Sequence, residues 1–65
     1  MAETGQGGKG EVLFEYVRVG GQLRVSAMDA ATGTEVVIVA PLSAPRSQVQ
    51  QVAIAKLRRK LEASR

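Results

Sequence analysis

Apolar and polar residues alternate along three successive segments of the chain, and this period of two is typical of β-strands with one buried face. The first segment covers residues 11–19 and ends at Gly20-Gly21, a pair that readily adopts the positive φ of a two-residue hairpin turn. A second segment of the same kind follows and ends near Asp29. These two segments are therefore predicted to form an antiparallel hairpin.

A second turn signal lies between Asp29 and Thr34, where an acidic side chain can accept local backbone hydrogen bonds and Gly33 can adopt a left-handed conformation. A four-residue loop at this point pairs Asp29 with Thr34. The stretch 36–40 that follows is entirely apolar, which favours a central strand, although in a simple meander it comes last and lies at a sheet boundary. Prolines at positions 41 and 45 end this strand.

Both turns predict the same register. A two-residue loop places Val19 opposite Gln22, and counting back from the second turn places Ala27 opposite Val36. Because strand side chains alternate between faces, one face becomes the predicted core. Its members are Val12, Phe14, Tyr16, Leu23, Val25, Ala27, Val36, Ile38 and Ala40.

Residues 46–63 have helical rather than strand spacing. Val49, Ala53, Leu57 and Leu61, with Ile54 at their edge, form an apolar stripe of the kind that packs on a sheet. Two starts are possible: Ser43 could cap the helix with a proline in the first turn, or Ser47 and Gln50 could form a capping box. The predicted fold is α+β, a three-stranded antiparallel β-meander with one C-terminal α-helix packed on one face (β-β-β-α).

The domain is predicted to span residues 11–65. Residues 1–10 contain four glycines and no branched apolar residue, so ordering them would cost more entropy than they could repay. We therefore expect a disordered tail there, whose removal changes stability by a few tenths of a kcal/mol at most.

The composition argues against most enzyme classes. The 65-residue chain has no His and no Cys, which removes imidazole acid-base chemistry, thiolate nucleophiles and the usual zinc ligands. We expect a non-enzymatic protein with no metal, no cofactor and no small-molecule substrate. No apolar run is long enough to cross a membrane, and a reducing cytoplasm is the expected location. So short a chain buries only about 60% of its unfolded surface, which makes help from a partner chain plausible.

The chain also resembles a family of short bacterial proteins, mainly alphaproteobacterial, that is described as a domain of unknown function. The resemblance is carried by residues 11–20, by Thr32-Gly33-Thr34-Glu35-Val36, by Ser43-Ala44-Pro45 and by the Lys56-Leu57 helix. It covers roughly residues 11–62. It implies a self-contained β-β-β-α domain of bacterial origin and brings no catalytic residue, ligand or cofactor.

The face opposite the predicted core is unusually apolar for a surface. Its apolar members are the interface candidates Leu13, Val17, Val19, Met28, Val37 and Val39. One helix can cover only one face of the sheet, and an exposed apolar area of this extent typically marks an interface. We expect a homodimer or a protein partner here. The alternative is an ordinary half-wet strand surface, since scattered valines are common on strands.

Positive charge is concentrated at the C-terminus. Residues 46–65 carry six Lys or Arg against one Glu, a local charge of +5, whereas residues 1–45 carry three against five acids, a local charge of −2. Lys56, Arg59 and Lys60 are the nucleic-acid candidates, because they lie on one side of the predicted helix. Basic residues there also complement the helix dipole, and the chain offers no exposed aromatic platform for bases. Nucleic-acid binding is therefore the alternative function.

The remaining polar residues make a poor active site. Glu15 and Glu35 are the carboxylates of the open sheet face, and a cross-strand ion pair with Arg24 is their expected role. Ser26 on the same face has no base to activate it.

Overall fold

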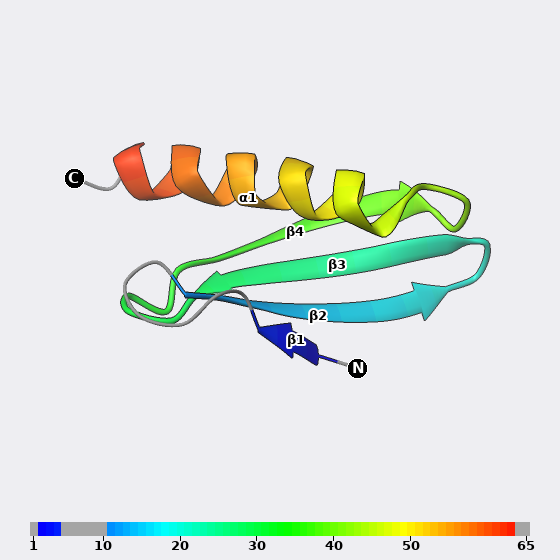
Figure 1. Ribbon diagram of the computed structural model, residues 1–65, viewed down its shortest axis with the longest axis horizontal. Helices are drawn as coiled ribbons and strands as arrows, with labels where there is room; N and C mark the ends of the chain where they lie inside the picture. Colours follow the sequence, from blue (N-terminus) through cyan, green and yellow to red (C-terminus); the bar gives the residue numbers. More distant parts are fainter. Residues whose placement is uncertain (1, 5–10, 64–65) are drawn as a thin grey trace.

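A computed structural model of the chain describes residues 2–4 and 11–63. Its elements are β1 (Ala2–Thr4), β2 (Val12–Val19), β3 (Gln22–Asp29), β4 (Glu35–Pro41) and α1 (Arg46–Ala63). The four strands form one antiparallel sheet in the order β1-β2-β3-β4. The helix runs along one face of this sheet, packed against β3 and β4 (Figure 1).

The meander β2-β3-β4 and the C-terminal helix confirm the predicted α+β fold. The register is also as predicted, with Val19 opposite Gln22 and Ala27 opposite Val36. Gly20 and Gly33 have φ values of 60° and 75° at the two turns, a region in which a side chain would be strained. The backbone amide of Asp29 donates to the carbonyl of Thr34 (2.8 Å), which closes the second turn as a four-residue loop.

The structure differs from the predicted tail at Ala2–Thr4. These residues form β1 and pair with β2, with Ala2 opposite Glu15 and Thr4 opposite Leu13. Main-chain hydrogen bonds to an open strand edge need no apolar side chain, so composition alone does not predict such a strand. The rest of the predicted tail lies outside the described residues.

The expectation that residues 36–40 form a central strand is wrong. β3 lies between β2 and β4, and β4 is the last strand of the sheet. A continuous apolar run is typical of a strand buried on both faces. In β4, however, alternate residues of the run lie on two different surfaces, the core and the side of the sheet away from α1. Val36 and Ala40 face the helix and are buried, whereas Val39 lies on the opposite side and is 58% exposed.

The core lies between the sheet and α1. All nine residues of the predicted core face belong to it or pack against it, and so do the predicted helix residues. The buried members are Phe14, Tyr16, Val25, Ala27, Val36, Ala40, Val49, Ala53 and Leu57, with Val12, Leu23, Ile38, Ile54 and Leu61 partly buried around them.

The helix begins at Arg46, so neither of the two expected starts is observed. The backbone amide of Val49 donates to the carbonyl of Pro45 (3.1 Å), which makes Pro45 the last residue before the helix. Before it, the amide of Ala44 donates to the Pro41 carbonyl (3.0 Å) and turns the chain back over the sheet.

Tyr16 ties the first turns of α1 to β2. Its hydroxyl oxygen accepts a hydrogen bond from Nε2 of Gln50 (2.7 Å), and the guanidinium carbon of Arg46 lies 4.2 Å from the centre of its ring. The second contact is a cation–π interaction. These contacts extend the helix packing from β3 and β4 to the neighbouring strand β2.

Candidate protein-interaction surface

The side of the sheet opposite α1, here called the open face, consists of every second residue of β2, β3 and β4. The strand register arranges these residues in four rows across the strands. From one end to the other, the rows are Leu13-Met28-Glu35, Glu15-Ser26-Val37, Val17-Arg24-Val39 and Val19-Gln22-Pro41.

All six interface candidates lie on the open face. Val17, Val19 and Val39 are 45%, 55% and 58% exposed, and they are three of the five large exposed hydrophobic residues in the described part of the chain. Leu13, Met28 and Val37 are half-buried by their neighbours. The structure thus brings the candidates into one area, in which each of the four rows also contains at least one polar residue.

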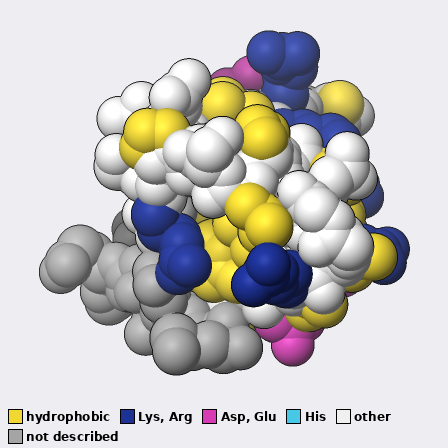
Figure 2. All heavy atoms as spheres, turned by 90° about the vertical axis from the view of Figure 1, so that its right-hand side faces the viewer, with side chains coloured by type: hydrophobic (Ala, Val, Ile, Leu, Met, Phe, Trp, Pro, Cys, Tyr) yellow, Lys and Arg dark blue, Asp and Glu magenta, His cyan; other side chains and the backbone are white. Residues whose placement is uncertain are grey.

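One end of the open face is slightly hollow. Val19, Gln22, Arg24, Val37 and Val39 line a shallow depression of about 310 Å³. Figure 2 looks at the end of the molecule that carries the β2–β3 turn and the connection from β4 to α1, and it shows hydrophobic side chains beside Lys and Arg side chains. A shallow apolar surface flanked by charge suits another protein surface better than it suits an enclosed small molecule.

The outer edge of β4 is partly covered by the helix. Nζ of Lys56 donates to the carbonyl of Val37 (3.0 Å) and Nζ of Lys60 donates to the carbonyl of Glu35 (2.9 Å). Four residues of a helix advance about 6 Å and two residues of a strand advance about 6.7 Å, so lysines four positions apart match carbonyls two positions apart. Lysine on a sheet edge is a common protection against pairing with another chain.

Replacing Lys56 and Lys60 together by alanine should therefore open this edge. We expect the free energy of unfolding to change by only about 0.5 kcal/mol, because both side chains are exposed. The double variant should form larger particles over time at high concentration, measured by light scattering. The matched control is the pair Arg58→Ala and Arg59→Ala, which removes the same charge. Equal particle growth in both double variants would contradict an edge-protecting role.

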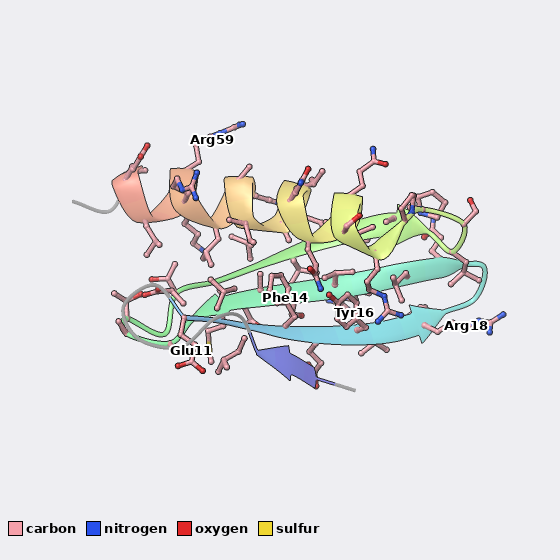
Figure 3. All side chains as sticks on the ribbon, in the orientation of Figure 1. Glu11, Phe14, Tyr16, Arg18 and Arg59 are labelled. Carbon is pink, nitrogen blue, oxygen red and sulfur yellow. The ribbon has the colours of Figure 1, made fainter. Side chains whose placement is uncertain are left out.

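The nucleic-acid candidates are not free to act as one group of charges. Two of them, Lys56 and Lys60, donate to carbonyls of β4. Arg59 points away from the sheet on the outer side of α1 (Figure 3). The match between the lysines and the β4 carbonyls could have been found from the four-residue spacing of the lysines, once β4 was known to lie beside the helix.

The expected ion pair on the open face is absent. Among the described side chains, no ion pair joins Arg24 to Glu15 or to Glu35, although Glu15 and Arg24 lie in neighbouring rows. This expectation was wrong because register fixes where strand residues lie but not where exposed, flexible side chains point. The described residues also contain no group of three or more acidic side chains that could hold a metal ion.

Sequence reasoning missed a second apolar area at the edge of the molecule. Ile38, Val39, Ala40, Pro41, Ala44, Gln48, Val49 and Val52 line a groove of about 270 Å³ between β4 and the start of α1. Val52 is 52% exposed there. It stands one helical turn before Lys56, so the lysine pattern that protects the edge of β4 ends at this residue.

Comparison with known proteins identifies the family and nothing beyond it. A family model described as a domain of unknown function (DUF6898) matches residues 9–64, so the chain belongs to this family, which confirms the resemblance seen in the sequence. No curated protein and no solved structure matches the chain. Within the described ranges, no helix is long and apolar enough to span a membrane.

Proposed function

We propose that this member of the DUF6898 family is a small non-enzymatic protein-interaction module that forms a homodimer through the open face. The observation that carries the proposal is the apolar part of the open face, which the six interface candidates form with Glu15, Arg24, Ser26 and Gln22 between them. On a domain of this size, such a surface is costly to leave in water. A second copy is the simplest partner, because the same surface is then buried on both chains.

The groups that cover the two edges of the sheet support the open face as the site of contact in the dimer. β1 pairs with part of the outer edge of β2, and Lys56 and Lys60 donate hydrogen bonds to carbonyls on the outer edge of β4. Pairing through backbone hydrogen bonds at either edge would have to compete with these groups. The open face has no such cover from the described residues.

The other parts of the proposal rest on composition. A chain without His and Cys lacks the commonest general bases and nucleophiles. The absence of cysteine also fits a reducing cytoplasm, where we place the protein. We place its origin in bacteria, as the family resemblance implies.

Changing Val37 to lysine tests the proposal. Val37 lies in the second row of the open face and is half-buried, so Val37→Lys would put an unpaired charge into the contact. We expect association to weaken by several kcal/mol, while the core beneath α1 keeps its packing. Sedimentation velocity over a range of concentrations measures the change, and circular dichroism checks the fold.

The control is Gln51→Lys, which adds the same charge on the exposed side of α1 and should leave the dimer intact. A wild-type protein that is monomeric at high micromolar concentration would refute the dimer. A dimer that tolerates Val37→Lys as well as Gln51→Lys would move the contact away from the open face.

A further inference from the structure

We infer that the two copies pack with their strands reversed, so that Arg24 of each copy lies beside Glu15 of the other. This inference rests on the proposed function, because it concerns the arrangement of the same contact. It follows from the positions of the charged residues within the four rows of the open face.

Two arrangements with a two-fold axis allow the two open faces to pack flat against each other with their strands aligned. In the first, the axis runs along the strands, and β3 lies over β3 of the partner in the same direction. Each residue of β3 then meets its own counterpart. Arg24 would meet the partner's Arg24 in the middle of a buried contact, where like charges are strongly unfavourable.

In the second arrangement, the axis runs across the strands and reverses their direction. The first row then lies over the partner's fourth row, and the second row over the partner's third. Arg24 faces the partner's Ser26, and the next residue in that row is the partner's Glu15. The guanidinium and the carboxylate lie within reach of each other, twice in the dimer because of the symmetry.

The apolar residues also fit the reversed arrangement. Val37 faces the partner's Val39, and Leu13 faces the partner's Val19. Glu35 falls opposite the partner's Pro41 at the rim, where its carboxylate can stay in water. The reversed arrangement thus pairs four of the six interface candidates with each other. It places Met28 opposite the partner's Gln22 and Val17 opposite the partner's Glu15, and it leaves neither charge of the middle rows opposite a like charge.

The ionic groups are available for this pairing. Arg24 makes no ion pair with Glu15 or Glu35 within its own copy among the described side chains, and both Arg24 and Glu15 are exposed. Burying either group alone would be costly, whereas an arginine–carboxylate pair offsets much of that cost and selects one orientation. This is how charges in an interface set its register.

The size of the face indicates a weak dimer. Strands of seven or eight residues make a surface about 25 Å long, and three of them are about 14 Å wide. Two such faces bury on the order of 1,000 Å² once side-chain relief is counted, which is at the lower limit for a specific complex. We therefore expect a dissociation constant in the micromolar range.

Reversing the charge of Arg24 in one variant and the charge of Glu15 in another tests the reversed arrangement. Arg24→Glu alone gives two sets of facing carboxylates, and Glu15→Arg alone gives two sets of facing guanidinium groups. Each variant should self-associate at least about tenfold more weakly than the wild type. When the two variants are mixed, every pair is again opposite in sign, and the mixture should form a heterodimer with an affinity close to that of the wild-type dimer.

Native mass spectrometry identifies the heterodimer by its mass, sedimentation velocity gives its affinity, and Arg58→Glu on the exposed side of α1 is the control. Failure of the mixture to associate, with the wild type and the control both dimeric and sensitive to Val37→Lys, would overturn the reversed arrangement and leave the proposed function standing. A wild type that stays monomeric at high micromolar concentration would overturn both and leave the open face to a different protein.

Discussion

Leu57→Ala is expected to lower the free energy of unfolding by roughly 2 to 5 kcal/mol. Leu57 is 2% exposed and is, with Val25, one of the two largest fully buried side chains. Its removal takes away apolar contacts and leaves a cavity between α1 and the sheet. A 65-residue domain has a total stability of roughly 3 to 10 kcal/mol, so much of the variant should be unfolded at room temperature.

Chemical denaturation followed by circular dichroism measures this effect. Val52→Ala is the matched control, since it also shortens an apolar side chain of α1, but one that is 52% exposed. The control should change stability by about 0.5 kcal/mol or less. Equal losses in the two variants would show that the helix does not dock through the Leu57 side.

Ala53→Leu is expected to cost about 1 to 3 kcal/mol for the opposite reason, which is excess volume. Ala53 on α1 and Ala27 on β3 are both 0% exposed, so small side chains line both sides of the helix–sheet layer. A leucine at position 53 would have to push α1 away from the sheet or take a strained rotamer. Either change would also disturb the hydrogen bond between Gln50 and Tyr16, which lies one turn before it.

The control for this variant is Ala55→Leu, which makes the same substitution on the exposed side of the helix. Alanine and leucine have nearly equal helix propensities, so the midpoint of unfolding should hardly move. A stable Ala53→Leu variant with unchanged helix content would mean that the layer contains room that the buried alanines do not indicate.

Asp29 illustrates what a local sequence pattern predicts and what it does not. As the sequence predicts, this residue organises the second turn, where its carboxylate accepts hydrogen bonds from the amide (3.0 Å) and the hydroxyl (2.8 Å) of Thr32. Its side chain is nevertheless 7% exposed, the one charged residue among the buried residues that the structure describes. The turn was predictable because its hydrogen bonds join neighbours in sequence, whereas the burial depends on the chain packed around it.

The sequence by itself determined the three-strand register, the two faces of the meander and the helix stripe. Turn geometry and the two periodicities, 2 for strands and 3.6 for the helix, are local properties, and two independent turns agreed. The composition of the open face follows from the same alternation, so the candidate surface could be predicted residue by residue.

Only the tertiary structure decided what covers the strand edges and which charges meet. β1 pairs with β2, and Lys56 and Lys60 reach the carbonyls of β4 across 19 and 25 positions of sequence. Arg24 remains unpaired with the carboxylates of its own face. Such contacts join backbone groups or flexible side chains that are distant in sequence, and no hydrophobic pattern encodes them. They depend on where the chain places its elements in space.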